Sequence, residues 1–224
     1  MWSCSKSDDN EDSRTPVGEA FDPPNGTYME AFIRPDSLIL SFIKGNSSYL
    51  SRIQTDFSLD NTHRRNCVIY AYASAYKSDV AKYKEYAKYY CDTAYYESHT
   101  IGYDCVGCLM PLNSISVVAD QDIDESHPTG SSLNDLFKIS YSRFYQYIKN
   151  GYIPDIRPNA YTLDSISELS TFKGTYLFPE KAALIFKKEP APGKYTFTVT
   201  LDFGEDPLTG KKVTVPPASI EIEF

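Results

Sequence analysis

The most regular alternation of apolar and polar positions lies near the C-terminus, over residues 195–203. Its apolar members are Tyr195, Phe197, Val199, Leu201 and Phe203, and three threonines and an aspartate separate them. Because successive side chains of a strand point to opposite faces, this period of two predicts a strand with one buried and one solvated face. Shorter apolar runs predict further strands at 29–33, 38–43, 115–119, 183–186, 213–215 and 220–224. Together they predict a mainly β fold with a helical insertion, an immunoglobulin-like β-sandwich.

One segment, about residues 78–96, has helical periodicity instead. The helical spacing begins just before it, with one face formed by Tyr76, Val80, Tyr83, Ala87, Tyr90, Cys91 and Ala94 and the opposite face by Lys77, Lys84, Glu85, Lys88 and Asp92. We therefore expect a helix that buries a stripe of tyrosines, with Cys91 at its inner edge. A short helix capped by Ser131 or Ser132 is expected to run through Phe137, because Ser132 and Asp135 have capping-box spacing. A second short helix is expected near 163–169.

The first 27 residues are polar and punctuated by prolines, which predicts a tether with little fixed structure, followed by one β-rich domain over 28–224. A boundary near residue 110 is the alternative. Of the 224 residues, 42% are hydrophobic, which suffices for a core, and no apolar run is long enough to span a bilayer. The formal charge of −8 and the absence of a basic stripe argue against nucleic acid as a partner.

The N-terminus carries a small residue and a cysteine, Ser3-Cys4, followed by an acidic run through Asp12. This pattern is typical of the site where a bacterial lipoprotein is cut and acylated. Only three residues precede Cys4, so the charged and apolar parts of a signal peptide are absent from this sequence. We predict that Cys4 is lipidated and anchors the chain to membrane lipid. The alternative is a disordered terminus that happens to contain a cysteine.

Four further cysteines, Cys67, Cys91, Cys105 and Cys108, predict a disulfide framework in an exported protein. Three pairings are possible, and one of them joins Cys67 to Cys91 and Cys105 to Cys108. The Cys-x-x-Cys spacing also suits a redox dithiol, but Pro111 disfavours the helix that such a motif requires. A four-cysteine zinc site usually requires two Cys-x-x-Cys pairs, and the sequence has only one.

Tyrosine is over-represented, with 19 residues, of which ten lie between Tyr70 and Tyr103. Most of these rings are expected to pack a helix onto a sheet. Tyr95, Tyr96 and Tyr103 lie off the inner face or beyond the helix, so they are the candidates for an exposed ligand-binding patch.

The polar residues contain no recognisable catalytic or metal motif. Asp120, Asp122 and Asp124 alternate as in a calcium loop, but Glu125 and Ser131 occupy the positions where an EF-hand needs glycine and glutamate. A looser calcium site stays open beside the simpler interpretation as a solvated loop. None of the three histidines lies in a nucleophile elbow or metalloprotease motif, so no catalytic residue, metal or cofactor is predicted.

Residues 115–124 and 127–137, followed by the Gly-x-Tyr-x-Phe-x-Val run at 193–199, resemble a segment of uncharacterised cell-surface lipoproteins of the Bacteroidota. The resemblance implies lipid anchoring at the outer membrane, facing the cell surface or the periplasm, and brings no established activity. We therefore expect a surface-tethered protein that binds a glycan or a protein partner without catalysis. A structural or assembly role in the cell envelope is the alternative, and an unrecognised hydrolase or dithiol redox protein is the third.

Overall fold

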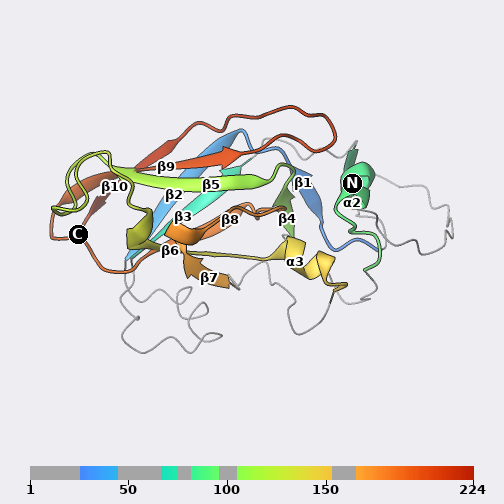
Figure 1. Cartoon of the computed structure of the whole chain (residues 1–224), viewed down its shortest axis with the longest axis horizontal. Coiled ribbons are helices and arrows are strands. Elements are labelled where there is room, and N and C mark those ends of the chain that lie inside the picture. Colours follow the sequence, from blue (N-terminus) through green and yellow to red (C-terminus); the bar gives the residue numbers. More distant parts are fainter. Residues whose placement is uncertain (1–25, 45–66, 75–81, 96–104, 153–164) are drawn as a thin grey trace.

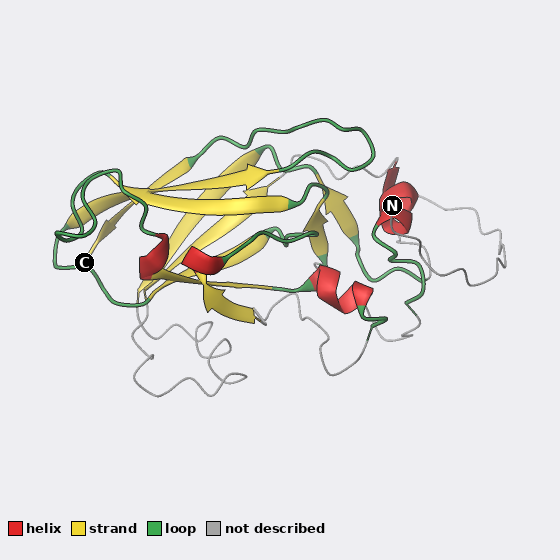
Figure 2. Cartoon of the chain, in the orientation of Figure 1, coloured by secondary structure: helices red, strands yellow, loops and turns green. Residues whose placement is uncertain are grey.

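A computed structural model describes residues 26–44, 67–74, 82–95, 105–152 and 165–224, and it is mainly β, as predicted (Figures 1 and 2). The strands are β1 (Ala31–Ile33), β2 (Ser37–Lys44), β3 (Cys67–Ser74), β4 (Val106–Cys108), β5 (Leu112–Ala119), β6 (Phe137–Tyr141), β7 (Ser165–Glu168), β8 (Lys181–Phe186), β9 (Lys194–Phe203) and β10 (Ala218–Glu223). The helices are α2 (Tyr83–Tyr89), α3 (Phe144–Lys149) and the 3-10 turns η3 (Asn134–Leu136) and η5 (Leu169–Thr171). Within these ranges, no helix has the length and apolar character needed to cross a bilayer.

The strands form two antiparallel sheets and one parallel pair. The larger sheet has the order β2-β3-β8-β6-β7, the smaller β10-β9-β5, and β1 pairs with β4 in parallel. Phe137 and Phe186 of the larger sheet meet Phe197 of the smaller one, with ring centroids 6.5 Å and 5.3 Å apart. The two antiparallel sheets therefore share one aromatic interior.

The alternating segment near the C-terminus confirms its prediction. In β9, Tyr195, Phe197, Val199, Leu201 and Phe203 are all buried, and the residues between them are partly or fully exposed. Strand β9 is central in its sheet, between β5 and β10. Its second face is wet because this sheet is covered on one side only.

Several segments differ from the sequence-based expectation. Strand β3 is not predicted from the sequence. It is buried on both faces, as the fully buried Val68 and Ile69 show, so its sequence is a continuous apolar run without alternation. The helix expected near 163–169 is instead strand β7, which pairs with β6. The residues expected to form a strand at 213–215 belong to no strand. At β7, long-range pairing with β6 outweighs local propensity.

Helix α2 is amphipathic in the predicted sense, with Tyr83 and Ala87 buried and Lys84 and Lys88 exposed. Three buried tyrosines of this segment also reach polar partners through their hydroxyls. Tyr83 donates to the Met29 carbonyl, Tyr86 to Asp206 over 2.8 Å, and Tyr90, just beyond the helix, to the Leu109 carbonyl. Each ring therefore buries apolar area and satisfies its polar tip at once.

The end of α2 corrects the predicted placement of Cys91 and Asp92. The Cys91 amide donates to Lys88 O (3.2 Å) and the Asp92 amide to Ala87 O (2.8 Å), the two bonds of a Schellman motif. Cys91 has φ 60°, in the left-handed position where glycine is usual, and it is exposed beyond the helix. Asp92, expected on the solvated face, is instead fully buried.

The buried Asp92 carboxylate joins three separate segments. It accepts hydrogen bonds from the amides of Tyr28 (2.7 Å) and Met29 (2.9 Å) and from the hydroxyl of Tyr152 (2.9 Å). Tyr152 ends a second Schellman motif after α3, since its amide donates to Tyr147 O. Burial raises the pKa of Asp92, and the three hydrogen bonds oppose that shift.

A second buried carboxylate, Asp206 in the β9–β10 connection, is anchored differently. It accepts hydrogen bonds from Arg34 (2.6 Å), Tyr86 (2.8 Å) and the amides of Leu208 and Thr209. Burial favours a raised pKa, but these hydrogen bonds and the Arg34 charge outweigh it and lower the pKa of Asp206 to about 2. Asp206 therefore holds the β9–β10 connection against α2 in the ionised form.

We predict that Asp206→Asn destabilises the protein at neutral pH by about 2–3 kcal/mol, because Arg34 loses its charged partner while remaining partly buried. A lowered folded pKa stabilises above the unfolded value of about 4 and loses that effect as the pH falls towards 2. The difference between wild type and variant in urea unfolding should thus be largest at pH 7 and 5 and smaller at pH 3.

The matched control is Asp202→Asn, an exposed aspartate at the end of β9 that pairs with Lys212. Its effect on the free energy of unfolding should be within about 0.5 kcal/mol. Equal losses for the two variants, or a loss at Asp206 that does not change with pH, would contradict the role of the Asp206 charge.

Candidate functional site

Of the predicted ligand-binding tyrosines, one lies among the described residues and it is buried. Tyr95 is 5% exposed, and its ring packs against Tyr28 and Tyr152 with both centroid distances 5.3 Å. Tyr95 therefore supports the interior and offers no exposed face. The other two candidates, Tyr96 and Tyr103, and the predicted lipidation site Cys4 lie outside the described residues.

The predicted disulfide framework is wrong for three of its four cysteines. Cys67, Cys105 and Cys108 are buried reduced thiols, and no disulfide joins two described residues. Cys105 and Cys108 are three residues apart at strand β4, so their Cα atoms are separated by roughly 10 Å along an extended chain. A disulfide requires less than about 7 Å.

The same cysteines are poorly suited to redox chemistry. Burial raises the pKa of Cys67 to about 11 and raises that of Cys108 as well. The attacking species in thiol exchange is the thiolate, which a raised pKa disfavours. The geometry of these thiols therefore favours a role in packing.

The aspartates of the candidate calcium loop bind nearby backbone. Asp122 accepts from the amide (2.6 Å) and hydroxyl (2.8 Å) of Thr129, and Asp120 accepts from the amide of Thr196 (2.8 Å). These bonds lower the pKa of both carboxyls. Over the described part of the chain, no group of three or more histidine, cysteine or acidic residues is placed to hold a metal ion. Asp122 is therefore a turn acceptor within the loop, and Asp120 ties the loop to strand β9.

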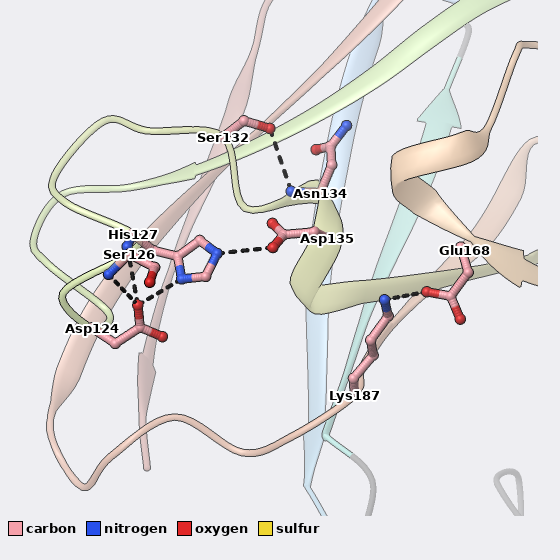
Figure 3. Close-up of polar contacts among 8 residues, drawn as sticks. All are labelled: Asp124, Ser126, His127, Ser132, Asn134, Asp135, Glu168 and Lys187. Atoms are coloured by element: carbon pink, nitrogen blue, oxygen red, sulfur yellow. Dashed lines mark hydrogen bonds and ion pairs between the residues drawn. The ribbon is translucent and has the colours of Figure 1, made fainter.

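Figure 3 shows the imidazole that closes this loop. His127 lies between two carboxylates, with Nδ1 2.7 Å from Asp124 and Nε2 3.0 Å from Asp135. The hydrogen bond to Asp135, followed by that to Asp124, raises the pKa of His127, and the same contacts lower the pKa of the two carboxyls. The doubly bonded imidazole links the loop to η3, which directly precedes β6.

The loop also covers the free edge of β5. The side chain of Asn134 accepts from the Val117 amide (3.0 Å) and donates to the Ile115 carbonyl (2.8 Å), as a paired strand would. The amides of Leu133 and Gly130 donate to the Val117 and Ala119 carbonyls of the same strand. An uncovered strand edge invites pairing with another chain. The acid-rich loop is therefore a structural cover, and its chemistry is explained without a ligand.

A second candidate is an exposed aromatic surface formed by residues of α2, α3 and the β7–β8 connection; both helices lie at the end of the molecule away from the β5–β6 loop (Figure 1). Tyr89 and Tyr176 are 47% and 43% exposed, and the half-buried Tyr145 lies beside them. Tyr145 and Tyr176 have ring centroids 4.9 Å apart, and all three rings pack edge-on around the buried Tyr90 at 5.0–6.5 Å. We call Tyr89, Tyr145 and Tyr176 the tyrosine surface.

The backbone fixes the position of Tyr176. Thr175 exchanges two hydrogen bonds of 2.9 Å with Leu112. Gly174 has φ 86°, and a Cβ atom at this residue would lie only 2.2 Å from the Leu112 carbonyl oxygen. Leu177, which follows Tyr176, is buried with φ 48°, a left-handed conformation that costs a bulky side chain roughly 1–2 kcal/mol. The fold therefore maintains strain at the point where an exposed ring is presented, a feature that recurs at binding sites.

Sequence reasoning missed this surface for an identifiable reason. Tyr89 follows Glu85 by four residues and so shares the outer, charged face of α2, which a complete helical wheel would have revealed. Tyr145 and Tyr176 come from α3 and the β7–β8 connection, which long-range folding alone brings next to Tyr90. No signal in the sequence predicts that meeting.

Comparison with known proteins adds no assignment: no family model matches the chain, and neither a curated protein nor a solved structure matches it.

We predict that His127 titrates with a pKa above the usual 6.5, and that Asp135→Asn lowers this pKa towards that value. Protonated His127 stabilises the loop, and this stabilisation is lost as the pH rises through the raised pKa of the histidine. The contribution of the two carboxylates is present above their unfolded pKa of about 4 and is lost as the pH falls below it. The bridge is thus strongest between about pH 4 and 6.5. Imidazole NMR shifts measure the titration, with Glu125→Gln as control; an unshifted pKa in wild type would refute the bridge.

We predict that Asn134→Ala lowers the free energy of unfolding by about 1–3 kcal/mol, because a β5 amide and carbonyl lose their partners. The uncovered edge should also increase self-association, measured by light scattering during urea unfolding. Asn113→Ala, an exposed asparagine of the same strand, should change neither quantity appreciably. Indistinguishable behaviour of the two variants would rule out the edge-covering role.

Proposed function

We propose that this protein is a non-catalytic binding protein whose tyrosine surface contacts a glycan or a protein partner. The observation that carries the proposal is the pair of large rings, Tyr89 and Tyr176, left 47% and 43% exposed on a buried aromatic floor. Aromatic side chains present a rigid apolar face and a polar tip at small entropic cost, and for that reason they dominate binding hot spots.

The arrangement suits stacking against a flat ligand. Tyr90 is 3% exposed and holds its neighbours edge-on, so the exposed rings need little reorganisation on binding. The strained Leu177 and the obligatory Gly174 support the same inference, because both fix Tyr176 at the surface although burial of its ring would be more stable. A preformed aromatic surface with hydroxyl rims can stack on a sugar ring and hydrogen-bond to its hydroxyl groups.

For cellular context, we propose that Cys4 is acylated and tethers the domain to the outer membrane, as in the Bacteroidota lipoproteins that the sequence resembles. The acidic run behind Cys4 supports this proposal. For the scaffold, we propose a β-sandwich, supported by the aromatic interior that two antiparallel sheets share. An immunoglobulin-like relation would require a departure from the four-plus-three strands of constant-type domains, because the described sheets have five and three.

We predict that Tyr176→Ala and Tyr89→Ala each weaken glycan binding about tenfold or more, the effect of removing one hot-spot ring. Affinity electrophoresis in gels that contain single polysaccharides, neutral and acidic, measures the retardation. Ile39→Ala removes a side chain of similar exposure (56%) from β2 and should leave the retardation unchanged.

Two results would count against the proposal. Retardation that persists in both tyrosine variants would contradict the assignment to this surface. A panel in which no polysaccharide retards the wild type would contradict the glycan form of the proposal. Far-ultraviolet circular dichroism of each variant checks that the fold is retained.

A further inference from the structure

We infer that the ligand of the tyrosine surface is an anionic carbohydrate, one that carries carboxylate or sulfate groups. This inference rests on the proposed binding function and names its ligand class. Two observations carry it: the charge of the elements that bear the surface, and the position of one ammonium group.

The elements around the tyrosine surface are basic within an acidic protein. Segments 82–95, 143–152 and 172–180 together contain six basic and three acidic residues, whereas the whole chain has 22 and 30. The basic residues are Lys82, Lys84, Lys88, Arg143, Lys149 and Lys173, and the acidic ones are Glu85, Asp92 and Glu180. Asp92 is fully buried and bonded internally, so it presents no charge to a ligand.

The opposite end of the molecule has the reverse sign. The β5–β6 connection, which lies near the C-terminus and away from α2 and α3 in Figure 1, carries Asp120, Asp122, Asp124 and Glu125. Charges separated along the molecule in this way orient an anionic ligand towards the helical end. Because the whole chain has a net charge of −8, an anionic ligand is attracted only near the basic elements and is repelled by the rest of the protein.

One cation lies directly at the aromatic surface. The ammonium of Lys149, at the end of α3, is 5.8 Å from the centroid of the Tyr145 ring, and that ring is 4.9 Å from Tyr176. The ammonium therefore lies on the Tyr145 side of the surface, where a sugar chain that stacks across Tyr145 and Tyr176 would bring an anionic substituent towards it. Stacking surface, phenolic hydroxyls and cation together match an acidic sugar, in which an apolar ring face and an anion occur in one residue.

The test uses two matched pairs of polymers: polygalacturonate with its methyl-esterified form, and dextran sulfate with dextran. We expect the wild-type protein to be retarded by the charged member of a pair at least tenfold more strongly than by the neutral one. Raising sodium chloride from about 50 to 500 mM should reduce that retardation several-fold, because salt screens the attraction.

The variant Lys149→Gln should weaken binding to the charged polymer about fivefold or more and leave any binding to the neutral one unchanged. Lys188→Gln, an exposed lysine between β8 and β9, is the matched control and should behave as wild type. Single-stranded oligothymidylate serves as a competitor that offers anions and stacking bases without sugar specificity.

The outcomes separate the two proposals. Equal retardation by charged and neutral polymers, with loss of binding in Tyr176→Ala but not in Lys149→Gln, would overturn the anionic ligand and leave the proposed binding function standing. Binding to oligothymidylate as tight as to the charged polysaccharide would overturn the carbohydrate class. No retardation by any of these polymers would overturn the anionic carbohydrate and, with it, the glycan form of the proposed function.

Discussion

The buried carboxylate of Asp92 is the constraint on which the helical end of the protein depends. Asp92 follows the end of α2, and its carboxylate accepts hydrogen bonds from the backbone amides of Tyr28 and Met29 and from the hydroxyl of Tyr152, just after α3. An isolated helix of seven residues such as α2 is unstable, so its position must come from tertiary contacts. Asp92 provides the contact that fixes both helix ends relative to β1.

The surplus of tyrosine follows from the same constraint. Helix α2 lies against backbone carbonyls and the second buried carboxylate, Asp206, rather than against a purely apolar sheet. Leucine at these positions would fill the volume but remove one donor from each of these acceptors, and losing a hydrogen bond at a buried acceptor costs more than forming it gains. Burial raises the pKa of Tyr83 and Tyr90, so both stay protonated and able to donate at any physiological pH.

The predictable parts of the fold are those whose signal is local. The alternation of β9 and the buried stripe of Tyr83, Ala87 and Tyr90 are visible in the sequence because one periodicity specifies one face. Strand β3 is not predictable in this way because burial on both faces removes the alternation. Asp92 is misplaced by sequence reasoning because a carboxylate on a helical wheel is assigned to solvent unless its partners are known, and here they lie 60 or more residues away.

The two ends of the molecule differ in whether the groups that could contact another molecule are already covered. At one end, Asn134 and the loop closed by His127 satisfy the edge of β5, so the polar groups most able to attract another chain are already paired. At the other, Tyr89 and Tyr176 remain in solvent although neighbouring rings are buried. The strained Leu177 beside Tyr176 is itself buried in the core, so burial of its side chain offsets the cost of its left-handed backbone. The exposure of Tyr89 and Tyr176 on a floor of buried rings is the feature that the ligand contact we propose would account for.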